Sequence, residues 1–592
     1  MKRRLLIALW VAAGVAPAVC PATVAVAADK SAAQLVPSTS AVFIEVTQPA
    51  ALASHVFDNA IVQRVVQVPE VKAGIDNNPK LAELYAAVAV FENELGVKWR
   101  PLVETLTAGG LAIAADPPTK AVIVLSKSRD PAMLEKFRDT FLRLARQDAQ
   151  NKGKPDPVKE GQYRGITAYK AGNGYVAAFG PWLIVTNQSE AGQRVLDNYL
   201  DAAGPALADD PQFKQARAAL APGHTAWAYV KLSTLRDLGV AKQLLIGGGK
   251  KDFGPELVSG GLAGALRQAP YATAELHSSA ASAKLAVSVP FDGSQAPSDR
   301  RFFFAEAGKP AADKPLKPAG TILAISSYRD LGAMWQASPD ILDENAAAGI
   351  ARADSALSGF FGGRAFGNDV LASFKPQQQL LVVKQDAESR QGPIPAIKLP
   401  AFAFIFQSTK AKELGPFFKI AFQNAVGLAG IAGTQQGMPL LDLNTEQRGQ
   451  GVVTSATYLP MVNEPNANAR IQYNFSPALG MVGDYFMLCS TKDLARDLVD
   501  LAQKRKGDEK VAASTLAELD PPLALEALRE NRQQLVAQNM LKKGHDKEAA
   551  EKEIDLLFDL IGKLRGINTN LTFAKDAARL ELGIQMAPAG TK

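Results

Sequence analysis

Short runs of alternating apolar and polar residues recur along the chain, separated by longer runs with apolar residues every three or four positions. The first kind predicts strands, for example at Val42–Val46 and at residues 111–115 and 121–126. The second kind predicts helices, and Asp130 and Pro131 supply the cap and first-turn proline of one of them. Strands joined by hairpins, with helices inserted between them, predict an α+β fold: a mainly antiparallel sheet with helices packed on a face.

The order of these runs occurs twice, which predicts an internal duplication. A Leu-x-Pro opening precedes a strand in each half, an aromatic strand leads into a helix in each half, and an alternating strand closes each half. The matching segments are Leu35–Pro37 and Leu316–Pro318, Trp182–Thr186 and Tyr485–Cys489, and the strands around Leu285 and Leu580. The predicted domains are residues 29–296 (copy one) and 316–586 (copy two), joined by a Pro/Ala-rich linker at 297–315 and followed by a tail at 587–592. Two unrelated α+β domains are the alternative.

The predicted copies differ mainly in two polar insertions of copy two, at Lys384–Pro400 and Val462–Arg470. The first insertion corresponds to only four residues of copy one, Asp116–Thr119. Within the linker, three consecutive phenylalanines at 302–304 are expected to dock on one of the domains, because such a cluster is unfavourable in water.

The first 28 residues have the composition of a secretory signal peptide. Lys2, Arg3 and Arg4 precede an uncharged run that ends at Cys20, and Ala25-Val26-Ala27 offers small residues to a signal peptidase. The chain is therefore expected to be exported, to the periplasm or the extracellular space, with no transmembrane span after cleavage. Cys20 leaves lipidation of the N-terminus open.

The charge of the exported chain gives no reason to expect nucleic-acid binding. The full sequence has 65 basic and 59 acidic residues, and the leader removes three of the basic ones. The mature chain is then nearly balanced, without the basic excess of nucleic-acid-binding proteins.

The residues that most often carry catalytic or metal chemistry form no recognisable motif. Only Cys489 remains after cleavage, and it is interpreted as a buried small hydrophobe, with a reactive thiol as the alternative. The four histidines, His55, His224, His277 and His545, are far apart in sequence and form no ligand pair. No metal and no cofactor are therefore expected, and catalytic residues stay unknown.

Two segments imitate ligand-binding motifs. Gly172-Asn173-Gly174 fits a dinucleotide-binding spelling, but a strand follows where that motif needs a helix, so a hairpin turning at Asn173–Gly174 is predicted. Asp442, Asn444 and Glu446 resemble the start of a calcium loop, but Gln447 stands where the loop needs glycine.

A helix expected at Lys412–Gly433 is unusually apolar, whereas its counterpart at Asp130–Gln150 carries several basic residues. Its phenylalanines suggest an apolar groove for a lipid-like ligand or partner, or a contact between the domains; they are Phe417, Phe418 and Phe422. Simple burial between the two halves is the alternative.

The exported start, the Leu-x-Pro openings, the duplicated layout and the length resemble an uncharacterised family of exported bacterial proteins described as a domain of unknown function. The resemblance covers most of the mature chain. It implies location and architecture, and no activity or catalytic residue comes with it.

These observations favour an exported cell-envelope protein that binds or scaffolds without catalysis, using the surface or cleft between its two domains. Its partner would be an envelope component, a protein or an apolar ligand. The alternative is a periplasmic or secreted hydrolase with dispersed carboxylates, because such residues leave no spacing pattern in a single sequence.

Overall fold

The structure is a computed structural model that describes residues 30–201, 204–245, 253–293, 298–305, 311–386, 393–462, 465, 467–507 and 509–587. The predicted signal peptide and Cys20 lie outside the described residues. The chain divides into two compact units. Unit 1 contains residues 30–241 and 269–288, and unit 2 contains residues 242–268 and 289–587.

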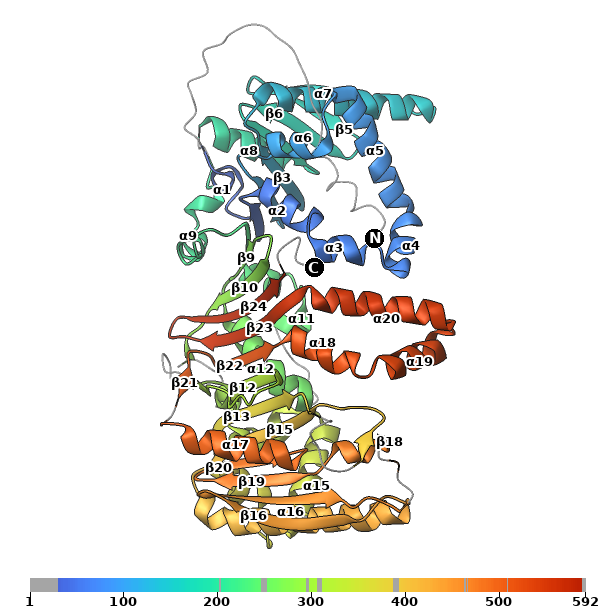
Figure 1. The fold of residues 1–592 in the computed structure, drawn as a ribbon. Helices are drawn as coiled ribbons and strands as arrows, with labels where there is room; N and C mark the ends of the chain where they lie inside the picture. Colours follow the sequence, from blue (N-terminus) through green and yellow to red (C-terminus); the bar gives the residue numbers. More distant parts are fainter. Residues whose placement is uncertain are drawn as a thin grey trace. The chain divides into compact units, whose positions relative to one another are not determined.

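Unit 1 is built from a sheet and the helices inserted between its strands (Figure 1). Its strands are β1 (Val42–Val46), β2 (Leu111–Asp116), β3 (Ala121–Lys127), β4 (Val158–Tyr163), β5 (Ile166–Ala171), β6 (Gly174–Phe179), β7 (Trp182–Thr186), β8 (Ala226–Val230), β9 (Ala272–Ser278) and β10 (Ser282–Pro290). Its helices are α1 (Ala32–Leu35), α2 (Pro49–Phe57), α3 (Ala60–Val65), α4 (Pro69–Asp76), α5 (Pro79–Leu95), α6 (Trp99–Leu106), α7 (Pro131–Asn151), α8 (Ser189–Leu200), η1 (Leu207–Asp209), α9 (Pro211–Ala218) and α10 (Leu232–Asp237).

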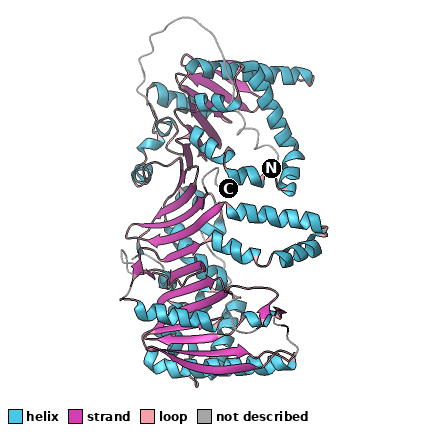
Figure 2. Cartoon of the chain, in the orientation of Figure 1, coloured by secondary structure: helices cyan, strands magenta, loops and turns pink. Residues whose placement is uncertain are grey.

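Unit 2 repeats this mixture of strands and helices (Figure 2). Its strands are β11 (Ala312–Asp313), β12 (Thr321–Tyr328), β13 (Phe374–Val383), β14 (Ile394–Pro395), β15 (Ala401–Ser408), β16 (Leu441–Arg448), β17 (Gly451–Tyr458), β18 (Ala467–Ala469), β19 (Ala478–Val482), β20 (Tyr485–Cys489), β21 (Lys510–Val511), β22 (Thr515–Leu519), β23 (Leu564–Phe573) and β24 (Ala577–Met586). Its helices are α11 (Lys242–Leu245), α12 (Phe253–Gln268), η3 (Ser298–Phe303), α13 (Leu331–Gln336), α14 (Ser338–Ile341), α15 (Glu344–Phe360), η4 (Phe366–Val370), η5 (Leu371–Ser373), α16 (Ala411–Gln435), η6 (Ile471–Asn474), α17 (Lys492–Lys504), α18 (Pro521–Arg529), α19 (Arg532–Lys543) and α20 (Lys547–Gly562).

The main sheets are antiparallel in both units. The strand order in unit 1 is β4-β5-β6-β7-β3-β2-β1-β8-β9-β10. The order in unit 2 is β16-β17-β19-β20-β15-β13-β12-β22-β23-β24. The predicted mixture of helices with a mainly antiparallel sheet is therefore confirmed.

Alternation along the strands of unit 1 buries side chains on both faces of its sheet. On β7, Ile184 joins the core beneath α8, whereas Leu183 and Val185 join the core beneath α7. The hairpin after β5 turns one residue earlier than predicted: Ala171 pairs with Gly174, and Gly172 takes the positive φ that the tight turn requires. A turn beginning at glycine, rather than at Asn173, satisfies this geometry.

Residues 242–268, grouped with copy one in the sequence analysis, belong to unit 2. Gly261 of α12 approaches Phe303 and Phe573 so closely that a Cβ there would lie 3.0 Å from the Phe303 Cβ. Phe302 and Phe303 are themselves buried in a cluster with Met334. The expectation that the Phe302–Phe304 segment docks on a domain is thus fulfilled in unit 2.

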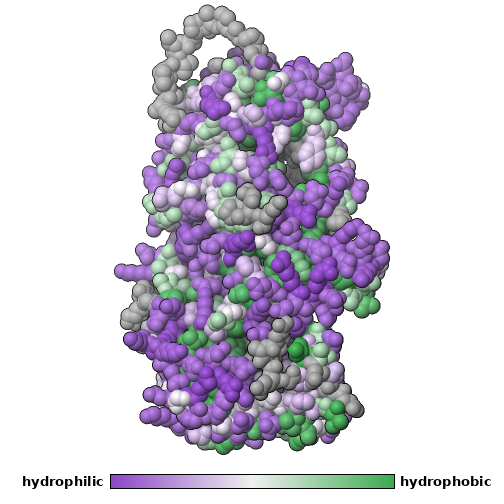
Figure 3. All heavy atoms as spheres, viewed as in Figure 1, coloured by the Kyte–Doolittle hydropathy of each residue, from purple (hydrophilic) through white to green (hydrophobic). Residues whose placement is uncertain are grey.

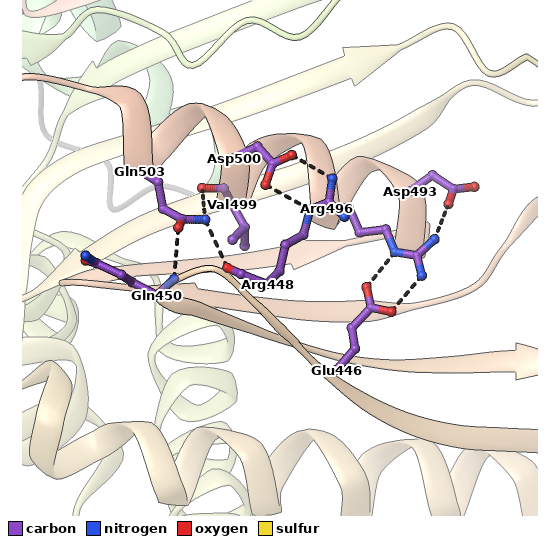
Figure 4. A network of polar contacts seen from close by, with 8 residues as sticks. All are labelled: Glu446, Arg448, Gln450, Asp493, Arg496, Val499, Asp500 and Gln503. Carbon is purple, nitrogen blue, oxygen red and sulfur yellow. Dashed lines mark hydrogen bonds and ion pairs between the residues drawn. The ribbon is translucent and has the colours of Figure 1, made fainter.

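Helix α17 covers one face of the sheet in unit 2 and is held there by charged pairs as well as by apolar packing. Its Leu494 and Leu498 are buried in the core. Arg496 donates to both carboxylate oxygens of Glu446 at 2.5 and 2.6 Å, and Arg448 donates to both oxygens of Asp500 at 2.8 and 2.6 Å (Figure 4). Such bidentate pairs fix the helix against β16 in one orientation.

Candidate functional site

The face of the unit 2 sheet opposite α17 carries apolar side chains that are only partly covered. Val382 of β13 pairs with Phe402 of β15, Leu380 pairs with Phe404, and Phe404 pairs in turn with Leu488 of β20. Phe402, Phe404 and Leu488 are 41%, 43% and 37% exposed. We call these five residues the open sheet face.

Strand alternation explains why these residues share one side. Their neighbours Leu381, Ala403 and Met487 point to the other side, where they are fully buried in the core beneath α17. The rings of Phe402 and Phe404 lie 6.3 Å apart on β15. Because both faces of β15 are apolar, the side away from α17 needs its own cover, and the described helices supply it only in part.

One end of this face is closed by an aromatic cluster that includes a residue singled out from the sequence. Phe418 of α16 packs against Phe486, which precedes Leu488 on the same side of β20, with ring centroids 4.7 Å apart. Phe374 packs against Phe418 and against Phe406, which follows Phe404 on β15. The helix expected at Lys412–Gly433 therefore borders the open sheet face at its N-terminal end.

The other two candidate phenylalanines of α16 do not reach the open sheet face together with Phe418. Phe417 is half-buried and lies under the guanidinium group of Arg364, 4.7 Å from the ring centroid. Arg364 also pairs with Glu413 at 2.8 Å. Phe422 is half-buried one turn further along the helix. Phe417 and Phe418 thus pack against one buried cluster with Phe361, and of the two only Phe418 contacts Phe486 at the border of the open sheet face.

The other end of the open sheet face is polar. Lys384, two residues after Val382, pairs with Glu526 of α18 at 2.9 Å and with Glu530, directly after α18, at 3.2 Å. The hydrogen bond that Lys384 donates to Glu526 raises the pKa of Lys384, so this lysine is charged at neutral pH. A small pocket lies beside it, lined by Lys384, Gln385, Pro395, Lys398, Leu399, Pro400, Asn474, Ala527 and Glu530.

The described parts of the two insertions expected in copy two meet beside this pocket. Strand β14, from the first insertion, pairs in parallel with β18, from the second. Asn531 binds both backbone groups of Lys398, at 2.8 and 2.7 Å, and Gln534 donates to the carbonyl of Ala396 at 2.7 Å. Amide side chains therefore hold the first insertion in an extended form at the edge of the open sheet face.

Unit 1 contains a group of hydrogen-bonding and ionisable side chains of the types that carry catalysis in other proteins. The fold brings the rings of His224 and His277, distant in sequence, to 6.4 Å, and His277 Nε2 lies 3.5 Å from a Glu275 carboxylate oxygen. That carboxylate also accepts from the Ala221 amide at 2.9 Å, and the Glu275 side chain is only 1% exposed. On the same strand, Ser278 bonds His55 Nδ1 at 2.9 Å.

These distances describe a structural hydrogen-bond network better than an active site. Glu275 is sealed from solvent, and a general acid or base must reach a substrate proton. Among the residues that the structure describes, no three His, Cys, Asp or Glu side chains are arranged to hold a metal ion. Cys489 is buried in the unit 2 core, and burial raises the pKa of its thiol, which opposes formation of the reactive thiolate.

Sequence reasoning did not single out Phe402, Phe404 or Leu488. The stretch Ala401–Phe406 alternates alanine or isoleucine with phenylalanine, so both sides of the strand are apolar and the pattern indicates burial on both. Which side a helix leaves uncovered depends on tertiary packing. The nearest available signal was the apolar character of the Lys412–Gly433 helix.

Comparisons with known proteins do not identify this chain. No protein-family model matches it, and no curated protein matches it. Among solved structures, crystal forms III, I and IV of a protein designated TP0453 align with 44% of this chain and with 80%, 79% and 81% of their own. Sequence identities are 12%, 14% and 11%, and TM-scores are 0.24, 0.24 and 0.25, too low to support an argument about fold or function.

None of the helices within the described ranges combines the length and the apolar character needed to cross a membrane.

Proposed function

We propose that this protein is an exported cell-envelope protein made of two copies of one α+β domain, and that it binds an apolar ligand on the open sheet face of unit 2 without catalysing a reaction. The observation that carries the proposal is that three partly exposed apolar side chains lie side by side. Phe402 and Phe404 point to the same side of β15, and Leu488 of β20 lies opposite Phe404. Contiguous exposed apolar side chains of this kind mark ligand or partner surfaces.

The chemistry along the open sheet face favours a ligand with an apolar chain and a polar end. Two phenylalanine rings and three aliphatic side chains offer dispersion contacts without hydrogen-bonding requirements. At one end stand the pocket and the charged Lys384, which offer polar partners to a head group. A fatty acid or similar amphiphile has both properties.

The strand orders and registers support the duplication. Each strand of the unit 1 sheet has a counterpart at the same position in the strand order of unit 2, from the pair β4 and β16 at one end to the pair β10 and β24 at the other. Leu276 faces Leu285 across β9 and β10, and Leu571 faces Leu580 across β23 and β24. Leu276 and Leu571 are separated by the same number of residues as Leu285 and Leu580, as is expected if the hairpin is repeated.

A second check of the duplication uses strands in the middle of each sheet. Phe179 pairs with Trp182 in unit 1, and Val482 pairs with Tyr485 in unit 2. Both hairpins therefore have the same length, and Trp182 and Tyr485 occupy the same position in them, which supports the predicted match. Two unrelated folds would agree in strand order and in hairpin length only by coincidence.

Export rests on the composition of the leader. A basic start, an uncharged run and the small residues before Ala28 favour cleavage at Ala27 or Ala28. Sequencing the N-terminus of the protein from a fractionated cell tests this: a mature chain beginning at Ala28 or Asp29 outside the cytoplasmic membrane is expected, and recovery of intact Met1 from the cytoplasm contradicts it.

Ligand binding is tested with a fluorescent fatty-acid analogue as the probe. The double variant Phe402→Ser, Phe404→Ser should bind the probe about tenfold more weakly or worse, because it removes two apolar contact surfaces. The matched control is Ile113→Ser on the sheet of unit 1, where Ile113 is 37% exposed. Equal binding by the double variant and the wild type would refute the site.

Hydrolysis is the alternative function, and the Glu275–His277 pair is the group on which it can be tested, although the burial of Glu275 argues against it. Screening the purified protein against ester, peptide and glycoside substrates, with Glu275→Gln as the comparison, tests it. Turnover that disappears in Glu275→Gln would favour the hydrolase over the binding protein.

A further inference from the structure

Strand β16 lies at the end of the strand order in unit 2 and pairs only with β17 among the described strands. Its outer edge therefore presents backbone N–H and C=O groups that no described strand satisfies. Edges of this kind are sites where another strand can add, and natural proteins usually protect them with lysine, proline or a bulge.

The hairpin geometry shows which residues of β16 offer these groups. Arg448 pairs with Gly451 across a two-residue turn, and Gly449 has a φ of 59°. In such a hairpin the pair next to the turn is hydrogen-bonded, and hydrogen-bonded pairs alternate along the strand. Arg448, Glu446, Asn444 and Asp442 therefore bond to β17, whereas Gln447, Thr445 and Leu443 direct their backbone groups outward.

The equivalent end strand of unit 1 is protected, but β16 is not. Strand β4 carries Lys159 and Gly161 and follows Pro155 and Pro157. Strand β16 contains neither lysine, proline nor glycine. Two of its three charged residues, Glu446 and Arg448, are turned toward α17, where they pair with Arg496 and Asp500 (Figure 4).

Helix α16 contacts β16 and adds an apolar surface next to this edge. Ile420, Leu428 and Ile431 are 52%, 58% and 61% exposed. No Asp, Glu, Lys or Arg occurs from position 420 to position 441. Figure 3 shows hydrophobic atoms gathered at the end of unit 2 that α16 and β16 form. The matching helix α7 instead exposes charged residues, including Arg143 and Arg146.

We propose that β16 and α16 form the interface of a homodimer, with a second copy of this chain as the occupant. The two β16 strands pair antiparallel about a two-fold axis at Thr445, which continues the sheet across the two copies. The two α16 helices then lie along each other on one side of the joined sheet and cover their exposed isoleucines and leucine. A two-fold interface requires such a self-complementary surface.

Charge selects the register. Because the outward backbone groups belong to Leu443, Thr445 and Gln447, hydrogen bonding between the copies requires these residues to pair among themselves. Centring the pair on Thr445 places Asp442 opposite Arg448 of the second copy, twice per dimer. Shifting the centre to Asn444 places Asp442 opposite Glu446, and shifting it to Glu446 places the two glutamates opposite each other. Among these three registers, the Thr445 register is the one that joins opposite charges.

The dimer is tested by sedimentation equilibrium of the full mature chain across a wide concentration range. Thr445→Pro removes the outward N–H together with the hydroxyl contact to Thr454, but no backbone hydrogen bond to β17, so it should dissociate the dimer while leaving the β16–β17 backbone ladder intact. Asp442→Arg, an exposed residue, should raise the dimer dissociation constant about tenfold or more, because two attractive pairs become repulsive. The matched control is Gln162→Pro, a change on the end strand of unit 1, which should leave the dimer unchanged.

The outcomes separate clearly. A concentration-dependent dimer that Thr445→Pro and Asp442→Arg weaken, and Gln162→Pro does not, supports the interface. A wild-type chain that stays monomeric at all concentrations overturns it, as does a dimer indifferent to both β16 variants. If Thr445→Pro proves unfolded by circular dichroism, Asp442→Arg decides alone, since it changes only a surface side chain. Fatty-acid probe binding by the dissociated variants reports separately on the proposed function.

Discussion

The two units place their main clusters of strand aromatics on different faces of the sheet, although unit 1 also packs Phe137 and Phe91 on the α7 side. In unit 1, an aromatic cluster lies in the core on the α8 side and consists of Phe43, Phe213, Trp227 and Tyr229. In unit 2 the α17 side is aliphatic and small, and the phenylalanines lie on the other side with Phe418. Two sheets with the same strand order therefore place their large side chains differently.

This difference explains why, within the described ranges, exposed rings lie on the sheet of unit 2 and not on that of unit 1. Val124 and Val185 of unit 1 are each 6% exposed beneath α6 and α7. Phe404 and Leu488, at equal rank in the strand order of unit 2, are 43% and 37% exposed. Small β-branched residues fit under a close helix, whereas larger side chains at the same positions need a partner of their own.

The largest expected effect comes from the aromatic core of unit 1. Phe213 is 1% exposed and contacts Phe43, Trp227 and Tyr229 with ring centroids 5.2 to 5.5 Å apart. Phe213→Ala should lower the free energy of unfolding by about 3–5 kcal/mol, because it removes the packing and leaves a cavity. Urea unfolding of the full chain, followed by tryptophan fluorescence, measures it.

Tyrosine at the neighbouring position provides the control for this prediction. Tyr229 has a buried hydroxyl without a hydrogen-bond partner among the described residues. Tyr229→Phe keeps the ring and removes the unsatisfied group, so it should leave stability unchanged or raise it slightly. A Phe213→Ala loss below about 1 kcal/mol would mean that the cluster does not form as described.

The strand pattern of unit 1 shows how much of the fold the sequence determines. The predicted strands Val42–Val46 and Trp182–Thr186 coincide with β1 and β7, and Asp130 caps α7 by accepting from the Met133 amide. These features depend on local alternation and capping. The grouping of α12 with unit 2 depends instead on contact with Phe303 and Phe573, which no local pattern indicates.

A loss of stability of intermediate size is expected at the end of the open sheet face that the Phe418 cluster closes, and a smaller loss is expected where the face is exposed. Phe418 is half-buried and contacts Phe361, Phe374 and Phe486, so Phe418→Ala should cost about 2 kcal/mol. Phe404→Ala should cost less than about 1 kcal/mol, because its ring is 43% exposed. Chemical denaturation of both variants compares them, and a larger loss for Phe404 than for Phe418 would show that the open sheet face is covered.

The candidate site was predictable from the sequence only at its border. The apolar run containing Phe418 indicated that something unusual lies at α16, and the insertions at Lys384–Pro400 and Val462–Arg470 were visible as additions. That β14 and β18 pair, and that His224 approaches His277, are consequences of long-range strand order. A single sequence contains no signal for contacts between segments so far apart along the chain.

The smallest expected effect concerns the charged clamp of α17. Helix α8 in unit 1 has a related pair, because Arg164, directly after β4, pairs with Asp197. The hydrogen bond from Arg496 lowers the pKa of Glu446 below its ordinary value. Arg496→Gln should cost about 1 kcal/mol at pH 7, as expected for a partly exposed bidentate pair. Arg194→Gln, in an exposed pair with Glu190 on α8, should have no measurable effect.

The stability lost in Arg496→Gln should depend on pH in a predictable direction. A carboxylate whose pKa is lower in the folded state contributes stability above its unfolded pKa, about 4.3 for glutamate, and loses that contribution as the pH falls through the folded value. The stability gap between wild type and Arg496→Gln should therefore be constant from about pH 8 to pH 6 and shrink below about pH 4. Thermal unfolding across this range measures it. A gap that widens on acidification would mean that Glu446 is not the partner that Arg496 stabilises.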